Sequence, residues 1–199
     1  MAAVGASRFP GGATVNTGLL IVIVVAVVII ALLAVVVARR RRSQGLQSRF
    51  GPEYPRAVAR ADDRRAAESQ LAEREQRHRR LDIVELEPAD RARYQEAWRA
   101  AQGRFVDDPA TATGEADALV TEVLRERGYP VEDFDQQADD VSVDHPDVVE
   151  NYRAAHVVAR ANGQGLASTD DLRQAFGHYR SLFAELLGTQ PDGHREEAQ

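Results

Sequence analysis

Residues 19–38 read LLIVIVVAVVIIALLAVVVA, a run of twenty Leu, Ile, Val and Ala side chains without a polar or charged residue. At about 1.5 Å per residue, a helix of this length measures roughly 30 Å, the thickness of the hydrocarbon core of a bilayer. Because lipid offers the backbone no hydrogen-bond partner, the run must be helical despite its many β-branched residues. The sequence therefore predicts one transmembrane helix over residues 19–38.

The charges that flank this run predict its orientation. Four arginines, Arg39, Arg40, Arg41 and Arg42, follow it at once, whereas Arg8 is the one charged side chain before it. A signal peptide would have a shorter apolar run with the positive charge in front. The positive-inside rule predicts a single-pass plasma-membrane protein, with residues 1–18 outside the cell and the rest in the cytoplasm. The four arginines are the predicted contacts to anionic lipid headgroups.

The charge of the 199-residue chain is strongly segregated. Residues 39–104 contain 17 Arg and 11 acidic residues, whereas residues 105–199 contain 7 Arg and 20 acidic residues. The overall net charge of −6 is therefore the difference between a basic membrane-proximal part and an acidic body. Two arrangements follow: the acidic part meets a basic partner, or it folds back on the chain's own basic segment.

Two segments connect the membrane run to the acidic body. Residues 39–55 are predicted as a basic connector, with glycines and prolines that interrupt helices. Residues 56–81 are rich in Ala, Glu, Gln and Arg and lack an apolar heptad, which predicts a charged stalk helix rather than a coiled coil. The stalk is either solvated on all sides or docked on the body. Three aromatics in connecting segments, Phe50, Tyr54 and Tyr129, are the predicted partner contacts.

Residues 82–188 are predicted to form a small all-α bundle. Apolar residues recur there at helical spacing, for example Tyr94, Trp98, Ala101 and Phe105. Helix starts are predicted at Pro88, at Asp108-Pro109, after Pro130, near Asp144-Pro146 and at Ser168 or Thr169, and helix ends at Gly128, Gly163 and Gly188. The fold class is thus all-α, with one transmembrane helix, a charged juxtamembrane helix and a bundle. Residues 189–199 are a predicted disordered tail.

The sequence predicts no catalytic, cofactor-binding or metal-binding residue. It contains no Cys and no Lys, which excludes thiolate sites and the lysine of a phosphate-binding loop. His145 and His156 are eleven residues apart, so a straight helix separates them by roughly 16 Å, too far for one metal ion. The basic run from Arg74 to Arg80 contains no aromatic residue, and the acidic body would repel a polyanion. We therefore do not expect nucleic acid as a partner.

Several short strings outside the membrane run form a distinctive combination: Arg49–Tyr54 (RFGPEY), Glu73–Leu81 (EREQRHRRL), Arg104–Pro109 (RFVDDP), Arg127–Pro130 (RGYP), Ser142–Pro146 (SVDHP) and Tyr179–Phe183 (YRSLF). With these strings the chain resembles a family of uncharacterised single-span membrane proteins from actinobacteria. The resemblance covers most of residues 46–188 and implies a shared architecture without an activity. Pro55 departs from the polar or acidic residue expected at its position.

These observations favour a non-catalytic adaptor or scaffold that presents a helical module to a protein partner at the cytoplasmic face of the membrane. The alternative is an enzyme or a ligand-binding bundle that binds a cation or a basic ligand. Its candidate site is the acidic cluster from Asp144 to Glu150. A convergent polar pocket would favour the alternative.

Overall fold

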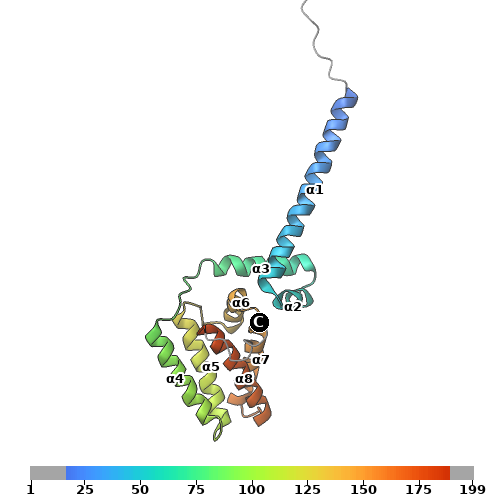
Figure 1. Cartoon of the computed structure of the whole chain (residues 1–199). Coiled ribbons are helices and arrows are strands. Elements are labelled where there is room, and N and C mark those ends of the chain that lie inside the picture. The colour runs from blue at the N-terminus through green and yellow to red at the C-terminus, as the bar shows by residue number, and fades with distance from the viewer. Residues whose placement is uncertain (1–16, 189–199) are drawn as a thin grey trace, which may run out of the picture. The chain divides into compact units, whose positions relative to one another are not determined.

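The computed structural model describes residues 17–188, which contain eight α-helices and no strand (Figure 1). The helices are α1 (Thr17–Phe50), α2 (Glu53–Arg60), α3 (Arg64–His78), α4 (Pro88–Arg104), α5 (Pro109–Glu126), α6 (Phe134–Asp144), α7 (Val149–Gly163) and α8 (Thr169–Leu186). The all-α prediction is confirmed. The predictions for residues 1–16 and for the tail at 189–199 lie outside the described residues.

The chain divides into two compact units, with the boundary between Gln44 and Gly45. The first unit contains most of α1, whose large apolar side chains from Leu20 to Val37 are all exposed. The most apolar 18-residue window of this helix has a mean hydropathy of 3.8. Helix α1 is therefore long and apolar enough to cross a membrane.

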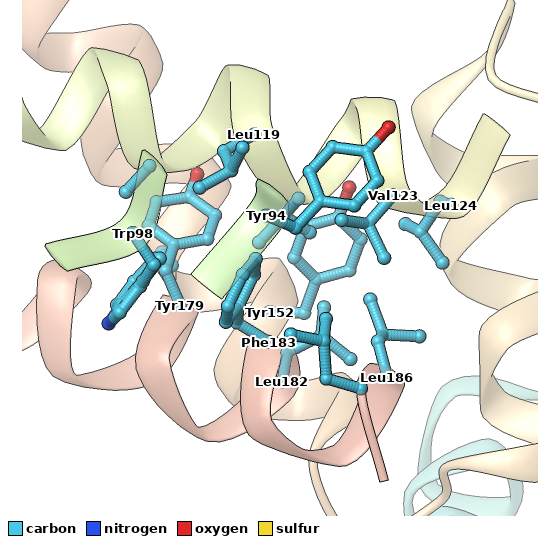
Figure 2. Packing of buried hydrophobic residues seen from close by; sticks show 14 of the residues in the cluster. Tyr94, Trp98, Leu119, Val123, Leu124, Tyr152, Tyr179, Leu182, Phe183 and Leu186 are labelled. Carbon is cyan, nitrogen blue, oxygen red and sulfur yellow. The ribbon is translucent and has the colours of Figure 1, made fainter. Parts of the chain in front are cut away.

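The second unit contains a large apolar core between α4, α5, α6, α7 and α8 (Figure 2). The indole of Trp98 on α4 stacks on two phenyl rings of α8, with ring centroids 5.0 Å from Phe176 and 4.7 Å from Phe183. Leu119, Val123 and Leu124 of α5 pack into the same core, together with Tyr152, Tyr179, Leu182 and Leu186. The predicted apolar stripes are thus the faces that the helices bury.

Buried hydroxyls in this core have hydrogen-bond partners. The Tyr179 hydroxyl donates to Asp117 Oδ1 at 2.6 Å, and the Tyr152 hydroxyl donates to Gln137 Oε1 at 3.0 Å. Burial raises the pKa of Tyr179 above its ordinary value, and the charge of Asp117 raises it further. Both tyrosines therefore serve as uncharged donors that tie helices together.

Side-chain caps begin several bundle helices, as the sequence predicts. Asp108 accepts a hydrogen bond from the Thr111 amide at 3.0 Å at the start of α5. Ser168 and Asp171 form a reciprocal capping box at the start of α8. These caps satisfy backbone donors that the first helical turn leaves unpaired.

The predicted connector at 39–55 is mostly helical, which corrects the sequence interpretation. Helix α1 continues through Gly45 to Phe50, and the chain turns only at Gly51 and Pro52. A helical glycine costs only about 1 kcal/mol relative to alanine. Burial of Leu46 and Phe50, which lie one turn apart, offsets that cost. Gly51 has a φ of +42°, a backbone conformation that suits glycine at this turn.

The predicted stalk at 56–81 is not one helix. It is divided between α2 and α3, and the carboxylate of Asp63 accepts from the Ala66 amide at 2.8 Å to begin α3. Together with the end of α1 and one residue of α6, the two helices form a small second core of seven buried residues: Leu46, Phe50, Tyr54, Ala57, Ala67, Leu71 and Val143. The sequence left open whether the stalk is solvated or docked, and the structure shows it docked on α6 (Figure 1).

Candidate functional site

The buried carboxylate of Glu53 lies at the centre of a charged cluster between α2, α3, α6 and α7. The Glu53 side chain is 1% exposed and accepts one hydrogen bond from each of two arginines. Arg74 Nη1 of α3 donates to its Oε1 at 3.1 Å, and Arg153 Nη1 of α7 donates to its Oε2 at 2.9 Å. Glu53 thereby joins the first helix after the membrane run to the bundle.

Asp139 of α6 closes the cluster from the other side. Its Oδ1 lies 3.0 Å from Arg74 Nη2 and 3.3 Å from Arg153 Nη2, so both arginines bridge two carboxylates. Burial raises the pKa of Asp139 above its ordinary value, while Arg74 and Arg153 oppose that shift. Burial opposes the charge of Arg153, but its hydrogen bond to Glu53 holds the pKa of Arg153 above the ordinary value. The ion pairs therefore compensate the free-energy cost of removing the charges of Asp139 and Arg153 from water.

More ion pairs surround this centre. Glu150 of α7 lies 4.0 Å from Arg56 Nε, 3.5 Å from Arg60 Nη2 and 3.6 Å from Arg153 Nη1. Arg77 Nε of α3 lies 3.8 Å from Asp140 Oδ1 of α6. The pKa of Asp140 is raised by burial, and the positive charge of Arg77 opposes this effect. The basic side chains of α2 and α3 thus face acidic side chains of α6 and α7.

Asp144, at the end of α6, joins three further segments. His78 Nε2 of α3 lies 2.7 Å from Asp144 Oδ2, though outside hydrogen-bond geometry. The Tyr129 hydroxyl donates to the same oxygen at 2.9 Å, and Arg49 Nη2 lies 3.6 Å from Oδ1. Burial raises the pKa of Tyr129, and the negative charge of Asp144 raises it further. We call the whole set the ionic junction: Arg49, Glu53, Arg56, Arg60, Arg74, Arg77, His78, Tyr129, Asp139, Asp140, Asp144, Glu150 and Arg153.

The ionic junction shows which of the segregated charges meet in the structure. In the described chain, the acidic side chains of α6 and α7 pair with the chain's own basic segment. The chain thus shows the second arrangement, in which the acidic body folds back on the basic stalk. Of the seven buried residues in the smaller core, Val143 is the one that belongs to the bundle. Electrostatic contacts consequently make up most of the interface between the α2–α3 segment and the bundle.

The structure does not support the three predicted partner contacts. Phe50 is completely buried in the smaller core, and Tyr54 is 8% exposed beside it. Tyr129 is 2% exposed, with its ring in the larger core and its hydroxyl on Asp144. Because aromatic rings bury more apolar area than any other side chain, the connectors place them inside the fold. The four predicted lipid contacts, Arg39 to Arg42, are exposed on α1.

The acidic cluster from Asp144 to Glu150 has basic neighbours from the same chain. Asp144 is surrounded by Arg49, His78 and Tyr129, and Glu150 by three arginines. His145 and His156 lie at different places: His156 Nδ1 is 3.3 Å from Asp117, whereas His145 is next to Arg127. Within residues 17–188, no three His, Asp or Glu side chains are arranged to hold a metal ion.

Sequence reasoning missed Glu53, Arg74, Asp139 and Arg153 as a group. Glu53 and Arg153 are 100 positions apart, so no local spacing predicts their contact. One signal pointed to Glu53 and Arg74 but not to Asp139 or Arg153. Four of the strings that carry the family resemblance, RFGPEY, EREQRHRRL, RGYP and SVDHP, each contribute to the ionic junction. Comparison of the chain with protein-family models, curated proteins and solved structures finds no match. The family resemblance therefore stays a prediction.

Proposed function

We propose that the protein is a membrane-anchored adaptor that presents its helical module to a protein partner at the cytoplasmic face of the plasma membrane. The anchor is supported by α1, which is long and apolar enough to span a bilayer and ends in exposed arginines and a buried Phe50. In the second unit, the last turns of that helix contribute Leu46 and Phe50 to the smaller core of the module.

The observation that carries the adaptor role is a pair of exposed apolar side chains at one end of the bundle. Val106, between α4 and α5, is 83% exposed, and Leu166, between α7 and α8, is 74% exposed. The two loops are neighbours, since Asn162 Nδ2 donates to the Ala110 carbonyl at 2.8 Å. Covering each aliphatic side chain would contribute roughly 1.5–3 kcal/mol, which makes this end the proposed partner surface.

Photo-crosslinking in cells tests the adaptor role. A photoreactive amino acid at Val106 or Leu166 should capture one and the same protein, identified by mass spectrometry. The matched control is Gln136, an exposed polar position on α6, which should not capture it. Capture of lipid and of unrelated proteins alone, at both apolar positions, would refute the adaptor role.

A pair of reporter fusions tests the topology separately. Alkaline phosphatase fused after Gln199 should be inactive, and a green fluorescent protein at the same place should fluoresce, because Arg39 to Arg42 hold that side in the cytoplasm. Replacing the four arginines by glutamine while adding lysines before residue 19 should reverse both signals. Strong phosphatase activity of the unmodified chain would overturn the orientation.

A further inference from the structure

Residues 45–78 form a subdomain that is joined to the bundle mainly by charge. Its own core contains six of the seven buried residues of the smaller cluster, and Val143 is the single bundle residue among them. In contrast, Arg74, Arg77 and His78 of α3 all reach carboxylates of α6. The apolar contact between α3 and the bundle is therefore small.

The charged contacts are also imperfectly satisfied. Asp140 Oδ1, His78 Nε2 and Arg56 Nη1 are buried and make no hydrogen bond. Asp140 is 1% exposed, and its nearest basic partner, Arg77 Nε, is 3.8 Å away. Buried ion pairs of this kind contribute little net free energy, because desolvation cancels most of the attraction. Docking of α3 is thus a contact of modest strength that competition can reverse.

Helix α3 shows what this face of the bundle recognises. Leu71 supplies one apolar contact, and Arg74, Arg77 and His78 follow at spacings that place them on the same side of the helix. We propose that the acidic face of α6 is a binding site for arginine-rich amphipathic helices of partner proteins, and that α3 occupies it in cis. The face consists of Asp139, Asp140, Val143 and Asp144.

Occupation in cis makes the site autoinhibited. The nine residues between α3 and α4 keep α3 close to its site at high effective concentration. A partner helix therefore binds only the fraction of molecules in which α3 is released, and its apparent affinity falls by that fraction. This inference goes beyond the adaptor role, because it concerns a different surface and does not depend on the membrane topology.

Peptide binding to the full-length protein in lipid nanodiscs tests the inference. The probe is a capped synthetic peptide of residues 64–80, and the opened variant is Arg77→Glu/His78→Glu. Both substitutions face α6 and leave the pair between Arg74 and Glu53 intact. We expect the opened variant to bind the peptide at least roughly tenfold more tightly than the unmodified protein, because its site is vacated.

Three controls make the result decisive. The variant Arg65→Glu/Arg80→Gln changes the net charge equally at two exposed positions and should behave as the unmodified protein. A peptide with Arg74 and Arg77 replaced by glutamate should not bind. Fluorescence of Trp98, the chain's single tryptophan, reports whether the bundle is folded. If the opened variant is unfolded, Arg77→Gln/His78→Gln is used as the opened variant instead. The same increase in peptide affinity over the unmodified protein is then expected.

Two results would overturn the inference. The first is an opened, folded variant that binds the peptide no better than the unmodified protein does. The second is an unmodified protein that is a stable dimer, with α3 of each copy docked on the other, as mass photometry and crosslinks between differently labelled copies would show. That result would assign the face to a second copy of this chain.

Discussion

At the scale of single residues, Glu53 has the most demanding environment in the described chain. It is a fully buried carboxylate whose two oxygens each accept a hydrogen bond from a different arginine. Removing one member of a buried ion pair costs more than the pair contributes, because it leaves an uncompensated charge without water. The role of Glu53 is therefore to keep Arg74 and Arg153 satisfied rather than to add stability by itself.

Replacing Glu53 by glutamine should weaken the docking of α3. Arg74 would then keep its pair with Asp139, whereas Arg153 would keep Asp139 and Glu150. The free energy of opening of α3 should fall by about 3 kcal/mol. Native-state amide hydrogen exchange of α3 measures this change. The control is Glu96→Gln, which removes an exposed pair with Arg99 and should change the free energy by less than about 1 kcal/mol. Equal effects of the two substitutions would contradict the role of Glu53.

At the scale of an element, the end of α5 shows how a cap joins a helix to a connector. The Tyr129 amide donates to the Leu124 carbonyl at 2.9 Å, and the Gly128 amide donates to the Arg125 carbonyl at 3.0 Å. This is the Schellman pattern, and Gly128 has the φ of +94° that it requires. The connector between α3 and α4 crosses this end, where the Val84 amide donates to the Arg127 carbonyl at 3.0 Å.

Alanine at Gly128 should destabilise the bundle strongly. An added Cβ would lie 2.3 Å from the Asp82 carbonyl oxygen, so backbone must move in addition to the strain of the positive φ. We expect a loss of at least about 3 kcal/mol in the free energy of unfolding. Denaturant unfolding monitored by Trp98 fluorescence measures it. Gly114→Ala, inside the same helix with no heavy atom within 4 Å of the new Cβ, should instead stabilise by roughly 0.5–1 kcal/mol.

At the scale of the whole molecule, His145 connects the ends of several helices. Its Nε2 lies 3.4 Å from Arg127 Nη1 after α5, and its Nδ1 lies 3.5 Å from Glu185 Oε1 of α8. Burial lowers the pKa of His145 below its usual 6.5, and Arg127 lowers it further, against the charges of Glu185 and Asp144. The folded chain therefore holds His145 neutral more strongly than the unfolded chain does.

Stability of the bundle should consequently decrease in mild acid. The contribution of neutral His145 is complete above its ordinary pKa and is lost as the pH falls through the lower pKa of the folded state. We expect the melting temperature to fall between about pH 7 and about pH 5, and to fall less in His145→Gln. His178→Gln on α8 is the control and should retain the full decrease. Burial raises the pKa values of Asp139 and Asp140 in the folded chain, so the contribution of these two groups to stability increases as the pH falls. Their effect occurs closer to the ordinary pKa of a carboxylate than the effect of His145 does.

Parts of the fold that depend on local pattern were predictable. The span needs only an uninterrupted apolar run, and the cap at Ser168 needs only its neighbour Asp171. The break between α2 and α3 was missed, although Asp63 is a good helix cap, because Ala, Glu and Arg around it favour one continuous helix. The burial of Phe50, Tyr54 and Tyr129 was missed because the clusters that bury them also contain residues from distant segments, such as Val143 in the smaller core.

By itself, the sequence determined that the described part of the chain is all-helical, that one segment can cross a membrane, and that basic and acidic charges lie in different parts. These properties follow from side-chain periodicity and composition within a few turns. Only the tertiary structure decided that α6 pairs with α3 and α7 with α2, and that Glu53 is buried between Arg74 and Arg153. Opposite charges attract without fixed register, so which arginine meets which carboxylate depends on how the apolar residues of both cores pack.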